Sequence, residues 1–242
     1  MSQSIAGLID HALLHPTLTD EELKAGCELC RSLHVAAVCI KPYAVPLAKQ
    51  LLEGSGVAVC TVIGFPHGSN LPEVKALEAD LACQQGATEL DMVVNVGRVL
   101  SQDWKYVERD IRTVVEVAGR HGAITKVIFE TEFVADDALK IELCRVCDVA
   151  GADFVKTSTG FGYLRQPSGD FATVGATEHD IKLMRKHRGN RMQVKASGGI
   201  RDYATAARMR SLGATRIGTS SSANIIAGER EEMVTAAPTD GY

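Results

Sequence analysis

The chain has 242 residues, of which 45% are hydrophobic and 23% are charged, and its formal net charge at pH 7 is −4. This composition is typical of a folded globular protein that is long enough to bury a sizeable core. The mild negative charge argues against a nucleic-acid partner and against a membrane surface, because both favour basic patches.

Neither the N-terminus nor the cysteines indicate a secreted protein. The opening MSQSIAGLIDH has no positive stretch followed by a long apolar run, so it does not resemble a signal peptide, and no apolar run approaches the ~20 residues that span a bilayer. Cys27/Cys30 and Cys144/Cys147 each form a C-x-x-C pattern, but both pairs fall in helical patterns without matching histidines. We therefore expect reduced thiols, no metal site and a cytoplasmic location.

Short runs rich in β-branched residues alternate with helical stretches from one end of the chain to the other. The expected strands cover residues 7–11, 36–41, 57–63, 88–94, 124–130, 152–158, 191–197 and 214–220.

Three of the helical stretches between these strands have clear local signals. In 19–34, Thr19 and Glu22 form a capping box at the helix start. In 70–86, Pro72 stands near the start and Gly86 just past the end, as helix caps prefer. The stretch 103–122 has apolar residues spaced along one helical face.

Strands that alternate with helices predict a parallel sheet. Eight such units in under 250 residues fit a closed (β/α)8 TIM barrel, and the first strand is not followed by the Gly-rich turn of an open dinucleotide-binding sheet. No linker or change in composition divides the chain, so residues 1–242 are predicted to form a single domain.

Five charged residues, one in each of five expected strands, stand out because each lies among apolar residues in a strand that should be buried. They are Asp10, Asp91, Lys126, Lys156 and Lys195. Side chains alternate along a strand, and active sites of (β/α)8 barrels lie at the C-terminal strand ends, so these charges are predicted to gather there. Any one of them could be half of a structural ion pair, but five with both signs favour a functional site.

Two lysines close together suggest covalent chemistry at an amine. An ammonium cannot attack a carbonyl, and an unperturbed lysine titrates near ~10.4. Burial or a second ammonium nearby favours the neutral amine, so one lysine could be a Schiff-base nucleophile and the other its electrostatic activator. A carboxylate such as Asp91 could move protons during imine formation.

Two glycine-containing loops follow the last two expected strands. KASGGIR continues from Lys195 through residues 196–201, and GTSSS covers 218–222. Adjacent glycines let backbone N–H groups approach an anion, and loops at this place in a barrel frequently bind phosphate. A lone Gly-Gly is usually only a turn, but two such loops after neighbouring strands predict a phosphate site.

The phrases LDMVVN, KVIFET, VKTSTGF, VKASGGIRD and IGTSS occur here in an order and spacing that resembles the deoxyribose-phosphate aldolases, a class I aldolase family. The resemblance runs from about residue 7 to residue 227. It implies a (β/α)8 barrel that reversibly cleaves 2-deoxy-D-ribose 5-phosphate to acetaldehyde and D-glyceraldehyde 3-phosphate, without metal or organic cofactor. The partners implied are a phosphorylated sugar and aldehydes, with a possible homo-oligomer.

The resemblance also implies roles for individual residues. Lys156 matches the Schiff-base lysine, Lys195 the lysine that perturbs it, and Asp91 the proton-relay aspartate, while Lys126 and Asp10 complete the polar network. The implied phosphate contacts are Gly160, Gly198, Gly199, Gly218, Ser220 and Ser221, with Arg201 as a possible addition at the rim. His67 and Cys39 stand near strand ends, but packing explains each, and neither is expected to act in catalysis.

Two segments depart from the pattern expected of the family. The stretch 162–177 is longer than the usual connection. It could be a lid, a determinant of substrate size or a plain surface loop, so the identity of the substrate stays open. The tail from about 229 to 242 is expected to be flexible and ends on Tyr242, whose phenol could assist proton transfer. The alternatives to a deoxyribose-phosphate aldolase are a related Schiff-base aldolase for another sugar phosphate and a non-catalytic phosphosugar-binding barrel.

Overall fold

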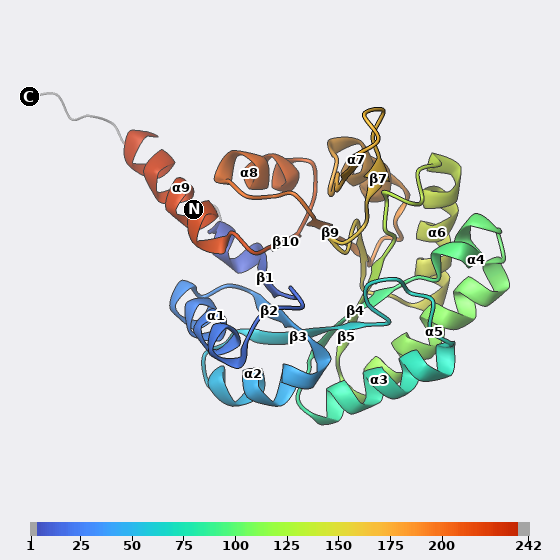
Figure 1. Ribbon diagram of the computed structural model, residues 1–242, viewed down its shortest axis with the longest axis horizontal. Helices are drawn as coiled ribbons and strands as arrows, with labels where there is room; N and C mark the ends of the chain where they lie inside the picture. Colours follow the sequence, from blue (N-terminus) through green and yellow to red (C-terminus); the bar gives the residue numbers. More distant parts are fainter. Residues whose placement is uncertain (1–3, 237–242) are drawn as a thin grey trace, which may run out of the picture.

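The computed structural model describes residues 4–236, and its central feature is a closed barrel of eight parallel strands with helices packed around it (Figure 1). Going round the barrel, the strands follow the order β1-β10-β9-β6-β5-β4-β3-β2, and β2 pairs with β1 to close it. The predicted single-domain (β/α)8 barrel is therefore confirmed.

All eight expected strands are present. The barrel strands are β1 (Ile9–Leu13), β2 (Ala37–Ile40), β3 (Ala58–Ile63), β4 (Glu89–Val93), β5 (Ile124–Ile128), β6 (Phe154–Lys156), β9 (Gln193–Ser197) and β10 (Arg216–Thr219). One boundary was wrong, because 5–8 form a short 3-10 helix, η1 (Ile5–Leu8), and β1 starts two residues later than expected. Asp10 is consequently the second residue of β1, which continues to Leu13.

The remaining elements connect the strands. They are α1 (Asp20–Leu33), η2 (Pro42–Ala44), α2 (Val45–Leu51), α3 (Pro72–Gln84), α4 (Val96–Leu100), α5 (Trp104–His121), α6 (Asp137–Ala150), α7 (Glu178–His187), α8 (Tyr203–Ser211) and α9 (Ser222–Ala236). Among residues 4–236 no helix is both long enough and apolar enough to cross a membrane.

The helix boundaries follow from local chemistry. Thr19 and Glu22 form the predicted capping box of α1, which satisfies backbone donors at the helix start. Pro72 is the first residue of α3, where its missing N–H costs nothing. α5 ends at Gly122, whose φ of 69° is the left-handed conformation that glycine adopts without strain.

The apolar core has two parts. The larger part lies between the outside of the barrel and the helices and includes Val107, Ile111 and Val114 of the predicted α5 face. The smaller part fills one side of the barrel interior with Cys39, Cys60 and their neighbours. The rest of the interior contains buried charges, and this is where the site lies.

The two segments that depart from the family pattern lie outside the barrel. The long connection 162–177 includes a small antiparallel hairpin of β7 (Leu164–Arg165) and β8 (Phe171–Ala172), and β7 is labelled near the top of Figure 1. The expected flexible tail does not begin at 229, because α9 continues to Ala236 and buried Glu229 accepts a hydrogen bond from the Ile5 N–H at 2.8 Å. Tyr242 lies outside the described residues.

Candidate active site

The barrel brings all five sequence-predicted charges into one buried group. Asp10, Asp91 and Lys126 are completely inaccessible to solvent, and Lys156 and Lys195 are nearly so. Register explains the convergence, because β4 sets Asp91 beside Lys126 of β5, and β6 sets Lys156 beside Lys195 of β9. Side chains at paired positions point to the same face of a sheet, which here is the barrel interior.

Six charged groups form a closed circuit of ion pairs, which we call the charge ring. Its members, in order of contact, are Arg216, Asp10, Lys195, Asp91, Lys126 and Glu89. Successive nitrogen and oxygen atoms lie 2.6–2.9 Å apart, with a shorter contact between Lys195 and Asp10. Cations and anions alternate around the ring, so each buried charge has opposite charges on both sides, as burial of ions requires.

This arrangement fixes the protonation of the carboxylates. Burial alone would raise the pKa of Asp10, but Lys195, Lys126 and Arg216 outweigh it and lower the pKa to about 2. Burial is likewise outweighed at Asp91, where Lys126, Lys156 and Lys195 hold the pKa well below its ordinary range. Both carboxylates are therefore ionised at neutral pH.

The ring cations are held in their charged form by the same contacts. Burial would lower the pKa of Lys195, but Asp10 and Asp91 raise it above its ordinary value. The pKa of Lys126 is raised well above its ordinary value because Asp91, Asp10 and Glu89 outweigh its burial. Asp10 and Glu89 do the same for the pKa of Arg216.

Lys156 is attached to the ring at one point. It is the last residue of β6, and its Nζ donates to Asp91 Oδ2 at 2.6 Å, the same oxygen that accepts from Lys195 Nζ at 2.7 Å. Two lysine nitrogens thus share one carboxylate oxygen. Such a contact is repulsive when both are ammonium ions and is relieved when one is a neutral amine.

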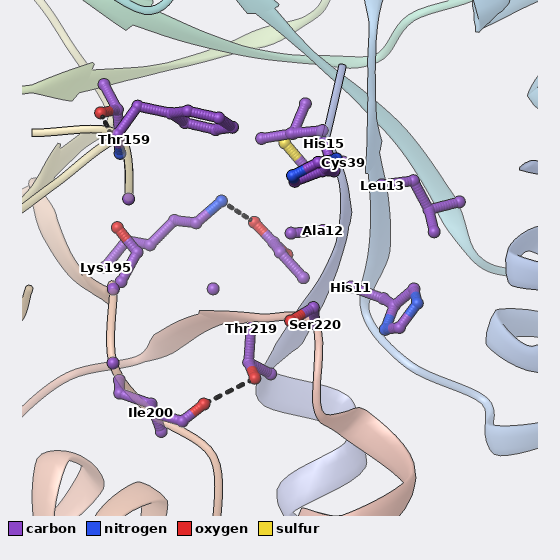
Figure 2. Close-up of a pocket in the computed structure, with 18 of the residues that line it drawn as sticks. His11, Ala12, Leu13, His15, Cys39, Thr159, Lys195, Ile200, Thr219 and Ser220 are labelled. Atoms are coloured by element: carbon purple, nitrogen blue, oxygen red, sulfur yellow. Dashed lines mark hydrogen bonds and ion pairs between the residues drawn. The ribbon is translucent and has the colours of Figure 1, made fainter. Parts of the chain in front are cut away.

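A cavity of about 460 Å³ opens above this group at the C-terminal end of the barrel. It is lined by Lys156 and Cys39 and by two members of the charge ring, Lys195 and Asp10. The four remaining ring members do not line it. In Figure 2, Lys195 points toward a carboxylate, which belongs to Asp10 of β1, and Cys39 and His15 lie on the opposite side of the cavity. Lys156 is accordingly open to a small molecule from above.

The predicted phosphate loops form the rim of the same cavity. Gly160, Gly198, Gly199, Gly218 and Ser220 all line it. The backbone N–H groups of Gly160, Gly198 and Gly199 have no hydrogen-bond acceptor within residues 4–236, and all three glycines have positive φ angles. Free N–H groups on a concave rim are the donors that an anion requires.

The two remaining phosphate candidates fall in different places. Arg201 lines the cavity and is exposed, so its guanidinium is available to an anion. Ser221 is not among the lining residues, and its N–H already donates to Thr219 Oγ1 at 2.9 Å. From this part of the chain the cavity is instead lined by Thr219, the last residue of β10, and by Ser220, which Figure 2 shows side by side.

Two buried glutamates that sequence reasoning did not single out support the rim. Glu130 accepts the N–H of Thr159 at 3.0 Å, and also the Thr159 hydroxyl. Glu132 accepts the hydroxyl of Ser158 at 2.8 Å and the N–H of Gly175 at 2.8 Å. Both therefore hold the segment that follows Lys156 in place.

Glu89 and Arg216, which complete the charge ring, were also missed. A signal existed in each strand, because Glu89 stands two residues before Asp91 and Arg216 two before Gly218, and i,i+2 residues share a face. Each lies at the N-terminal end of its strand, where functional residues of such barrels were not expected.

The thiols and carboxylates in the barrel are spaced closely enough to be considered as metal ligands. Cys39, Cys60 and Asp91 place their ligand atoms within 4.8 Å of one another. Lys126 Nζ, however, lies 2.8 Å from Asp91 Oδ1 and 3.3 Å from Cys60 Sγ, so an ammonium ion already holds the position between these ligands. The residues do not fit a cation unless that lysine is displaced.

The helical C-x-x-C pairs have inert thiols. Burial raises the pKa of Cys27 to about 11, and that of Cys30 and of Cys144 to about 12. All seven cysteines of the chain are free and buried. Thiols of this kind pack as small apolar groups.

A lysine-rich, phosphate-ready site at the C-terminal end of a (β/α)8 barrel defines a carbonyl-directed enzyme of the aldolase class. The sequence profile of the DeoC/LacD family aldolases matches residues 5–227. The chain belongs to this family and is an aldolase, that is, a lyase.

Individual relatives cover almost the whole chain. It is 48% identical to the deoxyribose-phosphate aldolase of Halalkalibacterium halodurans, over 96% of this chain and 99% of the relative. It is 43% identical to that of Rhodopirellula baltica, over 98% and 97%. Among solved structures, a tetrameric deoxyribose phosphate aldolase from Aeropyrum pernix matches with a TM-score of 0.83 and 33% identity, over 94% of this chain and 92% of that one.

Proposed function

We propose that this enzyme reversibly cleaves 2-deoxy-D-ribose 5-phosphate to acetaldehyde and D-glyceraldehyde 3-phosphate through an imine at Lys156. The observation that carries the proposal is the pair Lys156 and Lys195, which share Asp91 Oδ2 at the floor of a cavity rimmed by free backbone N–H groups. The names of the relatives described above support this choice of substrate.

In the cleavage direction, the neutral amine of Lys156 attacks the aldehyde carbon of the open-chain sugar. Asp91, which is within hydrogen-bond distance of Lys156, moves protons as the carbinolamine forms and loses water. The protonated imine then accepts the electron pair of the C2–C3 bond as that bond breaks and the C3 hydroxyl loses its proton. D-glyceraldehyde 3-phosphate leaves, and the enamine is protonated and hydrolysed to acetaldehyde.

Lys195 acts as a fixed cation in this scheme. Its contacts to Asp10 and Asp91 hold it as an ammonium ion, so its charge opposes a second ammonium on Lys156. Lys126 and Asp10 keep Asp91 and Lys195 in place. Gly160, Gly198 and Gly199 bind the phosphate, with Gly218, Ser220 and Arg201 beside them at the rim.

The cellular location and the oligomeric state of the enzyme are also inferred. Seven free, buried thiols are consistent with a reducing cytoplasm. The tetramer named for the Aeropyrum pernix relative supports self-association of this chain. An exposed apolar stripe on α3 offers a surface for a second copy and consists of Val74, Leu77 and Leu81, together with Leu71 just before the helix.

Reductive trapping tests the proposal. The enzyme is incubated with acetaldehyde and cyanoborohydride, and its peptides are analysed by mass spectrometry. We expect a two-carbon adduct on the peptide containing Lys156, and Lys156→Ala should abolish both the adduct and the cleavage of 2-deoxy-D-ribose 5-phosphate. Lys182→Ala is the matched control, because Lys182 is an exposed lysine paired with Glu178 on α7 and should leave both unchanged.

Other outcomes would assign a different role to the site. An adduct on Lys195 would exchange the roles of the two lysines. Trapping with a ketone donor but not with acetaldehyde would indicate another Schiff-base aldolase. The absence of any adduct would indicate a barrel that only binds phosphosugars.

A further inference from the structure

The charge ring is electrically balanced without Lys156. Its three carboxylates, from Asp10, Glu89 and Asp91, are matched by three cations, from Lys126, Lys195 and Arg216. Lys156 adds a fourth basic side chain to these three carboxylates and three cations. A proton on its amine would leave one positive charge with no carboxylate of its own.

The contacts agree with this count. Lys195 bonds to two carboxylates, Arg216 to two, and Lys126 to three at distances of up to 3.5 Å. Lys156 contacts one, and shares the oxygen with Lys195. Among the four cationic side chains of the cluster, Lys156 therefore has the fewest carboxylate contacts.

Two thiols and one imidazole also lie close to the cluster. Cys39 and Cys60 have sulfur atoms 3.7 Å apart, next to the Asp91 carboxylate. Burial raises the pKa of Cys60 well above its ordinary value, whereas the hydrogen bond from Cys60 lowers the pKa of Cys39, although burial and Asp91 act in the opposite direction there. His11 lines the cavity with Nδ1 2.8 Å from Ser222 Oγ, and burial lowers its pKa. The charge balance counts both thiols and the imidazole in their neutral forms.

We propose that the Glu89–Arg216 pair completes the charge balance of the ring and thereby keeps Lys156 as a neutral amine. This inference rests on the proposed function of Lys156. Both residues are the first of their strands, β4 and β10, and neither lines the active-site cavity, so they cannot touch the substrate. They are positioning residues that act through Asp10, Asp91 and Lys126.

The physical reason is the cost of burying a net charge. A balanced group of ion pairs is tolerated in a low-dielectric interior, while an uncompensated ion there is strongly disfavoured and loses its charge by gaining or releasing a proton. Lys156 is the cationic side chain with the fewest carboxylate contacts in the cluster. Tightly coupled groups titrate together, so the charge at one end of the ring influences protonation at the other.

The charge balance predicts that substitutions of Arg216 and of Glu89 shift the pH midpoint for labelling of Lys156 in opposite directions. Arg216→Gln removes a cation, so the ring becomes net negative and an ammonium on Lys156 is now compensated. Glu89→Gln removes an anion, so the ring becomes net positive and an ammonium on Lys156 is disfavoured further. The double variant Glu89→Gln/Arg216→Gln is balanced again.

The experiment measures how fast formaldehyde and cyanoborohydride methylate Lys156 between pH 5 and 10, by peptide mass spectrometry. Formaldehyde reacts with a neutral amine whatever the natural donor is, so the measurement does not depend on the proposed substrate. We expect the pH midpoint of labelling to rise by about one unit or more in Arg216→Gln and to fall in Glu89→Gln. It should return close to the wild-type value in the double variant.

Arg216→Lys is the matched control, because it keeps the charge and should keep the midpoint. An unchanged midpoint in both single variants, or equal shifts in Arg216→Gln and in the double variant, would overturn the proposal. If Arg216→Gln does not fold, the downward shift in Glu89→Gln and the recovery in the double variant decide the question. Failure of acetaldehyde trapping in the wild type would instead refute the proposed function and leave these labelling midpoints measurable.

Discussion

At the scale of single residues, the least expected feature is Glu130. It has a φ of 52°, in the left-handed region that non-glycine residues rarely adopt, and it is almost fully buried. Its carboxylate accepts hydrogen bonds from the N–H and the hydroxyl of Thr159, which precedes the rim residue Gly160. Strain at such a position is retained when it serves a neighbouring site, and here it orders the loop that follows Lys156.

The ionisation of Glu130 gives a prediction on stability. Burial raises its pKa from 4.5 to about 7, although the hydrogen bonds from Thr159 act in the opposite direction. The folded protein therefore binds more protons than the unfolded chain between these pH values, and Glu130 makes stability fall as pH rises from about 4.5 to about 7. Glu130→Gln should remove this dependence, which is on the order of 2 kcal/mol.

Urea denaturation of wild type and Glu130→Gln at several pH values from 5 to 8 measures the difference. The variant should gain stability relative to wild type as pH rises. Glu231→Gln, which changes an exposed glutamate on α9, should show no such trend. A constant difference between Glu130→Gln and wild type across this range would contradict the prediction.

At the scale of elements, the long connection between β6 and α7 contributes to the site through its returning end. Gly175 follows the β7–β8 hairpin, donates to Glu132 Oε1, and lies directly against Gly198 of the rim. The next residue, Ala176, donates its N–H to the Gly198 carbonyl at 3.1 Å. The inserted segment is therefore tied to the phosphate loop, while the hairpin itself exposes Tyr163 and Phe171 to solvent.

Gly175→Ala tests this link. A Cβ at Gly175 would lie 2.4 Å from the carbonyl carbon and oxygen of Gly198, so the rim must shift. Weaker hydrogen bonds to a charged phosphate cost about 1.5–3 kcal/mol, which is roughly a ten- to hundred-fold rise in KM for 2-deoxy-D-ribose 5-phosphate. The kcat/KM for unphosphorylated 2-deoxy-D-ribose should change much less.

Gly169→Ala is the control for backbone strain, because Gly169 also has a positive φ, but no atom lies within 4 Å of the position that a Cβ would take there. It should leave both substrates unaffected. Equal losses with the phosphorylated and unphosphorylated sugars in Gly175→Ala would show that the glycine contact does not act through the phosphate loop.

At the scale of the whole molecule, the exposed stripe on α3 is the surface that the fold itself does not use. Its four apolar side chains are each 46–63% exposed, and the three within the helix, Val74, Leu77 and Leu81, lie on the side opposite the buried residues Ala79 and Ala82. Single exposed apolar residues are common on monomers, but a contiguous stripe is typical of an interface.

We expect the protein to be oligomeric and Leu77→Glu to reduce its mass toward that of a 25.9 kDa monomer, as measured by light scattering during size-exclusion chromatography. A charge in the middle of an apolar interface has no partner, so association is weakened. Glu116→Gln on α5, outside the stripe, should keep the oligomer. A wild-type monomer, or an unchanged mass in Leu77→Glu, would contradict the use of this face.

The sequence by itself determined the elements and the direction of the charged side chains. Hydrophobic periodicity marked all eight strands, and the two-residue alternation along them was enough to predict that Asp91, Lys126, Lys156 and Lys195 share the barrel interior. The capping box of α1 and the start of α3 followed from local chemistry in the same way. These features depend on neighbours in the chain.

Which charges contact one another was decided only by the tertiary structure. Closure of the barrel brings β10 beside β1 and places Arg216 against Asp10, more than 200 positions earlier in the chain. The same closure encloses Glu89 in the charge ring and leaves Lys156 with one carboxylate contact, to Asp91. No local pattern specifies these pairings, because they follow from the relative register of strands that are distant in the sequence.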